Sequence, residues 1–478
     1  MTTYYIDPSA AVNGSGTEAS PFNVWTAVTW AAGNVYLQKA GTTYSAQLAP
    51  SASGTSGNPI TIGRYGSGAN PIITYTAAGV FLSARQFIDI IGIDAVGCTT
   101  HGFHIRTNGS NISTINLRGC VARNNGNNGF FLDGQVLTAT LSGVRFTACE
   151  AHYNGEHGYD TLGIIKTIRW DKCKASYNGR TTAGHGFSLH PFISNNIVSG
   201  WTLSSGTVYT RTLSASESVQ KFINLTDGVT LTKNPGATTT IASGEWDQSG
   251  TTLYVNLGAD PNTKTTAWRR AEHGPFYYYD CESWGNYTDP VAGEGHGFAA
   301  DDATSDAHYF RCKAWDNTGS GFQAQYTDRV SRTSCLAYNN ALSNFRTTGH
   351  TDTLDDEGCT SYGSGQHGFF YDAPFTAVTL KNSVACDNAL YGLIAAESGV
   401  TATNNATFGN GSGATASITN TNPVTADPLL SASHRPLQGS PLLQAGTFIS
   451  YARRDNIRVQ RPNPPCIGAF DVATMISG

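Results

Sequence analysis

Polar side chains of the kinds that transfer protons recur at fixed places after a Gly-Phe or Gly-Tyr pair. They stand one and three positions after the aromatic residue in successive copies of the pair, with Asn in place of Gly in one copy. Carboxylates and imidazoles there could act as general acids and bases, while amide and guanidinium groups could hold a substrate. The polar residues at these positions include Asp133, Asp160, Ser188, His190, Asp301, Gln323, Gln325 and Arg346, and Asp302 follows directly after Asp301.

Two reaction chemistries fit this set. A pair of carboxylic acids can cleave a glycosidic bond, and inverting enzymes hold the two groups about 6.5–9.5 Å apart whereas retaining enzymes hold them about 5–5.5 Å apart. Either Asp133 with Asp160 or Asp160 with Asp301 could form the inverting pair, with Asp301 or Asp302 as the acid. Alternatively, His190 could abstract the proton next to a uronate carboxylate while Arg346 neutralises that carboxylate, as elimination or epimerisation requires.

The hypothesis we favour makes Asp301 the central acid or base, assisted by Asp160 or Asp302, with His190 beside them. The substrate-binding residues would be Gln323, Gln325, Arg346, Ser188 and Asp133. A hypothesis from a different class is a glycan-binding adhesin or a structural particle protein without turnover.

A repeat of about two dozen residues must bring these side chains together. A block of the form Cys-x-Ala-x-x-Asn followed by Gly-Phe recurs, and the Cys residues from Cys312 through Cys335 to Cys359 lie 23 and 24 positions apart. Short apolar alternations without a helical period indicate the coils of a parallel β-helix, each with three strands and three bends. Equivalent residues of successive coils then stack about 4.8 Å apart. The sequence predicts an all-β, right-handed parallel β-helix.

The repeat is interrupted once. Cys173 and Cys281 are 108 positions apart, which is one coil plus extra chain with its own alternating runs. These runs predict a small inserted β domain, and the segment NVWTAVTWAAG predicts a short capping helix near the N-terminus. The expected division is 1–60 for the N-terminal cap and first strands, 61–197 for the first part of the β-helix, 198–264 for the insertion, 265–430 for the second part and 431–478 for the C-terminal cap.

Ten cysteines could indicate disulfides or a metal, but their positions favour neither. Seven fall in one inward column of the repeat, where parallel side chains have poor disulfide geometry, and no Cys-x-x-Cys pair is present. We expect buried free thiols that act as small apolar residues. No cofactor or metal ligand is predicted, although a divalent cation stays open as an alternative.

Two further columns allow more than one interpretation. His157, His185 and His296 each precede the Gly of the repeat, and turn residues that bond the backbone are favoured over a metal site. An outward aromatic column three positions after successive Cys residues could stack sugars, but we favour a subunit interface or a packed loop. That column consists of Trp284, Trp315, Tyr338 and Tyr362.

Composition and charge exclude several classes of protein. The 478 residues are 39% hydrophobic and 13% charged with a net charge of −5, which argues against a nucleic-acid or anionic-membrane partner. No apolar run is long enough to insert into a membrane. The opening MTTYYIDPSA has neither the basic nor the apolar region of a signal peptide.

The blocks SVACDNALYG and CEAHYNGEHGYD and the ending ADPLL…RPLQGSPLLQAG…IGAFD resemble right-handed parallel β-helix proteins that act on polysaccharides. That group includes phage tailspike depolymerases, pectate-lyase-like enzymes and mannuronan C5-epimerases. The resemblance implies a depolymerase of a bacterial surface polysaccharide or exopolysaccharide, an extracellular or virion-associated location, and a homotrimer as one assembly.

Local resemblance to the epimerases is carried by two strands. The family has a Tyr-Gly-Phe-Asp-Pro-His strand followed by Gly-Phe-x-x-Asp, and here HGFSLH ends at His190 and GFAAD ends at Asp301. His190 and Asp301 match the catalytic His and Asp of that family, whereas Ser188 replaces an Asp and His185 replaces the Tyr. The segment GEWDQSGTTLYVNLGADP resembles a small β-sandwich that interrupts some β-helix glycoside hydrolases, which favours hydrolysis.

Overall fold

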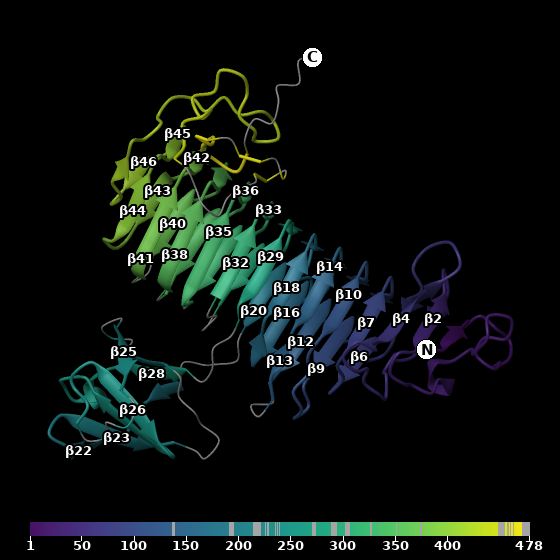
Figure 1. Cartoon of the computed structure of the whole chain (residues 1–478). Helices are drawn as coiled ribbons and strands as arrows, with labels where there is room; N and C mark the ends of the chain where they lie inside the picture. Colours follow the sequence, from purple (N-terminus) through teal and green to yellow (C-terminus); the bar gives the residue numbers. More distant parts are fainter. Residues whose placement is uncertain are drawn as a thin grey trace.

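The computed structural model describes the chain apart from a set of short segments. These are residues 136–138, 191–195, 214–220, 225, 227–228, 235, 237, 239, 270–273, 288–293, 302–305, 326, 350, 373–374, 448–454, 457, 459, 462 and 471–478. The rest folds into a right-handed parallel β-helix, as the repeat predicts (Figure 1).

Each coil contributes one strand to each of three parallel sheets, which we call sheets 1, 2 and 3 in chain order. In the described residues, sheet 1 has fourteen strands, sheet 2 twelve and sheet 3 eleven. The strands of sheet 1 are β1 (Thr3–Ile6), β2 (Val35–Lys39), β4 (Ile60–Tyr65), β7 (Ile88–Ile91), β10 (Ile115–Arg118), β14 (Val144–Thr147), β18 (Ile168–Asp171), β29 (Phe276–Tyr279), β32 (Asp306–Phe310), β35 (Arg329–Thr333), β38 (Thr351–Glu357), β41 (Phe375–Lys381), β44 (Val400–Thr403) and β47 (Asn420–Thr421).

Sheets 2 and 3 follow the same stacking. Sheet 2 consists of β3 (Thr43–Tyr44), β5 (Ile72–Ile73), β8 (Asp94–Val96), β11 (Val121–Arg123), β15 (Glu150–His152), β19 (Lys174–Ser176), β30 (Glu282–Trp284), β33 (Lys313–Trp315), β36 (Leu336–Tyr338), β39 (Thr360–Tyr362), β42 (Val384–Cys386) and β45 (Ala406–Phe408). Sheet 3 consists of β6 (Val80–Ser83), β9 (Phe103–Arg106), β12 (Phe130–Gly134), β16 (Tyr159–Gly163), β20 (Phe187–His190), β31 (Phe298–Ala300), β34 (Phe322–Gln325), β37 (Phe345–Thr348), β40 (Phe369–Asp372), β43 (Tyr391–Ala395) and β46 (Gly413–Ala416). A short pair, β13 (Leu141–Ser142) and β17 (Ile165–Lys166), lies outside the three sheets.

Like residues stack on like inside the coils. The aromatic residues of the Gly-Phe pairs form a continuous buried column, in which Tyr159 and Phe187 lie 4.6 Å apart between ring centroids. At Gly158, which precedes Tyr159, a side chain is excluded because a Cβ would lie 2.6 Å from the carbonyl oxygen of Gly186. All ten cysteines are buried and free, which confirms the prediction of apolar thiols.

The asparagine of the repeat forms a buried ladder. The side-chain amide of Asn125 donates to Asn154, that of Asn154 to Asn178, and that of Asn178 to Asn286, at 2.9–3.0 Å. The left-handed backbone conformation at this bend belongs to the residue before the ladder asparagine, as at Asn124. Each buried amide thus meets a partner on the next coil, which fixes the register of the stack.

The interrupting segment folds into its own sheet beside the coils (Figure 1). The sheet has a small core that includes Trp201, Phe222 and Trp246, and it begins at Asn196 and ends at Arg269, slightly outside the predicted 198–264. A 3₁₀ turn, η2 (Pro261–Thr263), lies within it. Its strands are β21 (Asn196–Val198), β22 (Thr202–Ser205), β23 (Val208–Thr212), β24 (Lys221–Asn224), β25 (Val229–Lys233), β26 (Glu245–Ser249), β27 (Thr252–Asn256) and β28 (Thr266–Arg269).

The N-terminal cap of the β-helix differs from the prediction. The predicted capping helix is only a single 3₁₀ turn, η1 (Trp25–Ala27), because β-branched residues flank the segment and no side chain caps it. Its Trp25 is nevertheless buried in the core. The C-terminal segment packs Ile467 and Phe470 onto the outer face of sheet 2, in clusters that include Val384 and Leu336.

Candidate active site

Sheet 3 carries the polar residues that the repeat placed on one face. Its parallel register pairs Asp160 with Ser188, Ser188 with Ala299, Ala299 with Gln323 and Gln323 with Arg346, which confirms the predicted stacking. We call this row the inner row. A second row, two residues farther along each strand, pairs Asp133 with Leu162 and Leu162 with His190.

The centre of the face is a cluster of three side chains from three coils. His190 ends β20, with its Nδ1 3.4 Å from Oδ1 of Asp160 and its Nε2 3.5 Å from Oδ2 of Asp301. Asp160 comes from β16 on the preceding coil, and Asp301 directly follows β31 on the next coil. The side chain of His190 is 34% exposed, against 9% for Asp160 and 13% for Asp301. His190 is therefore the member of the cluster that is most open to a substrate.

The two carboxylates stabilise the protonated form of His190. Burial by itself would lower the pKa of His190, but hydrogen bonds and charge from Asp160 and Asp301 outweigh burial and raise that pKa well above its ordinary value. Burial opposes ionisation of Asp160, and the imidazoles of His157 and His190 outweigh it and lower the Asp160 pKa. The resting cluster at neutral pH therefore contains an imidazolium beside an ionised, buried Asp160.

Two buried neighbours hold this cluster in place. The hydroxyl of Ser188, only 1% exposed, lies 2.8 Å from Nδ1 of His190. The side-chain amide of Asn128 donates to Oδ2 of Asp160 at 3.0 Å, and the carbonyl of the same amide accepts from the backbone of His157. Ser188 was predicted to bind substrate. In the structure its side chain is buried and its hydroxyl contacts His190.

A ladder of imidazoles lies next to the cluster. Nδ1 of His157 accepts the backbone N–H of His185 at 2.9 Å, Nδ1 of His185 accepts that of His296, and Nδ1 of His296 accepts that of Ser320 at 2.8 Å. This confirms the interpretation of the histidines as turn residues that bond the backbone. Burial lowers the pKa of His157 and of His296 to about 4, so both rings are neutral at pH 7.

The ladder also limits metal binding. Ring nitrogens and carboxylate oxygens of His157, Asp160 and His190 lie within 4.8 Å of one another, and His185, His190 and Asp301 form a similar group. A neutral imidazole whose Nδ1 accepts a hydrogen bond must carry its proton on Nε2. That nitrogen of His157 or His185 is then a donor rather than a metal ligand, and the arrangement suits anionic oxygens better than a cation.

Acidification should weaken the fold through this ladder. Between pH 6.5 and about 4 the unfolded chain protonates His296 while the folded chain does not, so stability is full above that window and falls as pH drops through it. From about pH 7.5 to about pH 4.5 this residue should cost about 2.5 kcal/mol. Urea denaturation of wild type and His296→Gln at both pH values measures it. An equal loss of stability in both proteins would contradict the assignment.

The other predicted site residues lie along the same face but outside the cluster. Asp133 is buried in a separate group, where its carboxylate lies 3.2 Å from Nε2 of His104 and 3.4 Å from Nε of Arg106. Gln325 continues the row of His190 and Asp301, because Ala300 pairs with Ala324. Asp302 lies outside the described residues.

The inner row carries unsatisfied polar atoms. Oε1 of Gln323 and Nε of Arg346 are buried without a hydrogen-bond partner among the described residues, and Oδ1 of Asp160 faces only the long 3.4 Å contact with His190. The amide nitrogen of Gln323 is held by Thr348 at 2.7 Å. Buried polar atoms without partners are rare in folded proteins and recur where a ligand supplies the missing bond.

Sequence reasoning missed the supporting residues of the cluster. Asn128 lies at a bend rather than on a strand, so its position in the repeat gave no reason to place it against Asp160. His104 was visible one position after Phe103 in the same pattern, yet its partner Asp133 was expected to bind substrate. The imidazole ladder, in contrast, was indicated by the histidine that precedes the glycine in several copies of the repeat.

The outward aromatic column lies on sheet 2, away from this face. Trp284 and Trp315 stack at 4.8 Å, and Tyr338 stacks on Trp315 at 5.7 Å. His434 of the C-terminal segment lies 4.6 Å from both Tyr338 and Tyr362. Part of the column is thus covered by packed chain, which confirms one of the expected alternatives for these two tyrosines.

Comparison with known proteins supports the fold of this chain and goes no further. No protein-family model matches the sequence, and no curated protein matches it. Pectate lyase Pel9A superposes with a TM-score of 0.50 at 14% identity, over 98% of this chain and 96% of that one. The likeness is one of architecture. The resemblance to right-handed parallel β-helix proteins is confirmed at the level of the fold.

Two other solved structures resemble the chain more weakly. ORF18 of Geobacillus virus E2 has a TM-score of 0.41 at 13% identity, over 72% of this chain and 52% of that one. The A-module of a mannuronan C-5 epimerase from Azotobacter vinelandii has a TM-score of 0.35 at 11% identity, over 83% and 89%. Within the described residues, no helix is long and apolar enough to cross a membrane.

Proposed function

We propose that this protein cleaves an acidic polysaccharide on the outward face of sheet 3, with His190 as the proton donor to the leaving oxygen. The observation that carries the proposal is the position of His190 between Asp160 and Asp301, combined with its raised pKa and its exposure. Perturbed titratable groups that converge in this way are typical of catalytic sites. The fold shared with pectate lyase Pel9A is compatible with this proposal.

Elimination fits the geometry better than hydrolysis by the two aspartates. The ring of His190 occupies the space between the carboxylates of Asp160 and Asp301, so a glycosidic bond cannot lie between these two groups. Asp301 and His190 are instead adjacent, as a base and an acid on one side of a uronate ring would be. Asp301 would take the proton next to the uronate carboxylate, the bond to the leaving oxygen would break, and His190 would protonate that oxygen.

The unsatisfied atoms of the inner row supply the rest of the proposal. Nε of Arg346, two coils beyond Asp301, would bind the carboxylate of a uronate farther along the polysaccharide and so align the chain on this face. Oε1 of Gln323 would accept from a sugar hydroxyl. His190 with a raised pKa serves as an acid, so the alternative in which it is the base loses support. The proposal also includes an extracellular or virion-associated location, assembly as a homotrimer, and catalysis that does not depend on a metal.

Hydrolysis is a second candidate, in which His190 would protonate the leaving oxygen while the adjacent Asp301 activates a water molecule. Product analysis separates the two. We expect a panel of bacterial acidic polysaccharides to yield fragments with the ultraviolet absorbance of an unsaturated uronate and without added water by mass. Fragments that gain one water per cleavage would support hydrolysis, and oligosaccharide binding without fragments would support a glycan-binding protein.

A further inference from the structure

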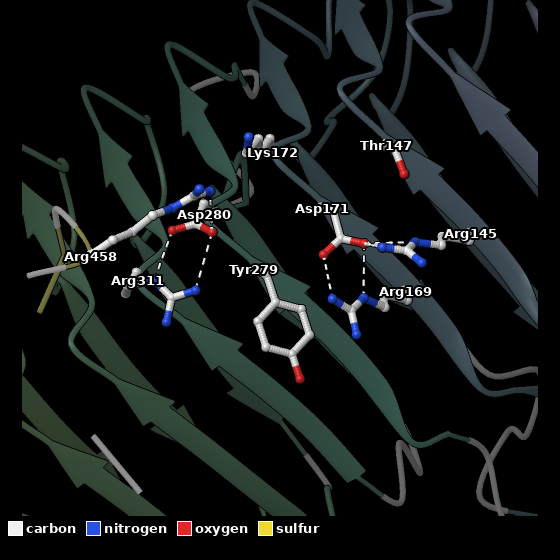
Figure 2. Close-up of a pocket in the computed structure, with 9 residues that line it drawn as sticks. All are labelled: Arg145, Thr147, Arg169, Asp171, Lys172, Tyr279, Asp280, Arg311 and Arg458. Atoms are coloured by element: carbon white, nitrogen blue, oxygen red, sulfur yellow. Dashed lines mark hydrogen bonds and ion pairs between the residues drawn. The ribbon is translucent and has the colours of Figure 1, made fainter. Parts of the chain in front are cut away.

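A basic hollow lies on sheet 1, separate from the candidate active site on sheet 3. It has a volume of about 380 Å³, within the range of small-ligand pockets, and opens where sheet 1 turns toward sheet 2. Four neighbouring coils and one residue of the C-terminal segment line it (Figure 2). The lining residues are Arg145, Thr147, Arg169, Asp171, Lys172, Tyr279, Asp280, Arg311 and Arg458.

The hollow has an excess of positive charge. Its five cationic side chains face two carboxylates, a local excess of three in a chain whose net charge is −5. Asp171 is shared by Arg145 and Arg169, while Asp280 is shared by Arg311 and by Arg458 from 178 positions away in the sequence. The two carboxylates therefore neutralise only part of the charge gathered around them.

Donors remain after these ion pairs are counted. Arg169 and Arg311 each use Nε and Nη2 on a carboxylate, and Arg145 likewise uses Nε and Nη2 on Asp171. Within the described part of the chain, Nη1 of each of these three arginines has no hydrogen-bond partner, and neither does Nζ of Lys172. Three of the four contacts to Asp171 converge on its Oδ2, and Oδ1 accepts only from Arg169, so this one carboxylate cannot satisfy all the donors gathered around it.

The guanidinium groups are held in fixed orientations. Arg169 lies over the ring of Tyr279, 4.3 Å from its centroid, and Tyr279 stacks on Phe310 at 4.9 Å. In Figure 2 the Tyr279 ring lies between the Asp171 cluster and the Asp280 cluster. Paired, stacked guanidinium groups lose little conformational entropy when they bind an oxyanion.

From this charge excess and these remaining donors we infer that the hollow binds anionic groups of an acidic glycan. The two arginine clusters on either side of Tyr279 suit two oxyanions carried on one chain better than a single free ion, and the tyrosine ring between them offers a surface for a sugar. The occupant is a uronate, phosphate or sulfate substituent, because bidentate guanidinium recognition is shared by these groups. The site goes beyond the proposed function, since it would anchor the polymer on a face remote from cleavage.

Binding to an inactive protein tests this site without relying on catalysis. In a His190→Gln background, inorganic phosphate and three classes of oligosaccharide (uronate, phosphate-bearing and sulfated) are titrated by calorimetry at low and at high salt. Arg145→Gln combined with Lys172→Gln should weaken binding of at least one class about tenfold, and added salt should weaken binding to the unaltered hollow. The control Arg123→Gln with Lys174→Gln removes the same charge from sheet 2 and should bind like the background.

Three outcomes overturn the inference. Absence of binding by all three classes would do so, as would equal affinities for the hollow variant and the sheet 2 control. Binding of inorganic phosphate without binding of any oligosaccharide would assign the hollow to free ions. Because cleavage is measured separately on the protein with His190 intact, failure of this site is distinguishable from failure of the proposed function.

Discussion

Replacing His190 by glutamine should lower kcat/KM on a confirmed polysaccharide substrate by about a thousandfold, while the protein keeps its fold. The expectation follows from the loss of a proton donor, because general acid catalysis by a positioned side chain contributes about 10²–10⁴-fold. Glutamine can still accept from Ser188 and donate toward Asp301, so the cluster keeps its volume and its hydrogen bonds. Initial rates of fragment formation, with thermal unfolding to verify the fold, measure the effect.

Two further variants make this prediction specific. His104→Gln removes an imidazole from the same sheet, in the separate cluster with Asp133, and should leave the rate near that of wild type. Asp160→Asn removes the charge that helps to raise the His190 pKa, so the alkaline limb of the pH–rate profile should move to lower pH. Activity of His190→Gln within about tenfold of wild type would refute the role of His190.

Replacing Asp356 by alanine should destabilise the β-helix by about 3–5 kcal/mol. Asp356 lies inside the coils, where both carboxylate oxygens bind Arg332 at 2.6 and 2.7 Å and one accepts from the hydroxyl of Tyr371 at 2.8 Å. Arg332 is 0% exposed and also lies 5.3 Å from the centroid of the Phe345 ring. Loss of Asp356 leaves a guanidinium buried without its counter-charge, which is why a large penalty is expected. The midpoint of urea denaturation measures it.

Matched variants separate burial from charge. Glu282→Gln breaks the half-exposed contact with Lys313 on sheet 2 and should cost less than about 1 kcal/mol. Arg332→Met combined with Asp356→Leu removes both charges and should recover much of the loss, since apolar pairs of similar volume often replace buried ion pairs without penalty. A loss in Asp356→Ala no larger than in Glu282→Gln would show that the buried pair contributes little.

The sequence alone determined the coil, the register and the face that carries the site. Alternation of side chains along a strand and a period of about two dozen residues are local properties, and together they place Asp160, Ser188 and Gln323 in one row. They also place His190 and Asp301 on adjacent coils next to that row. For the same reason the cysteines were correctly expected to be buried and free.

Only the tertiary structure decided how these groups interact. Alternation fixes the direction of a side chain but not its partners. Three-dimensional packing decides that His190 lies between two carboxylates, and its pKa rises as a result. Alternation from Val330 places Arg332 inward, but the pattern does not show that Asp356 on the next coil compensates its charge. The contact of Arg458 with Asp280 depends on the path of the C-terminal segment across the corner of the coils. Burial and electrostatic partners depend on three-dimensional packing between distant segments, and a local pattern does not contain that information.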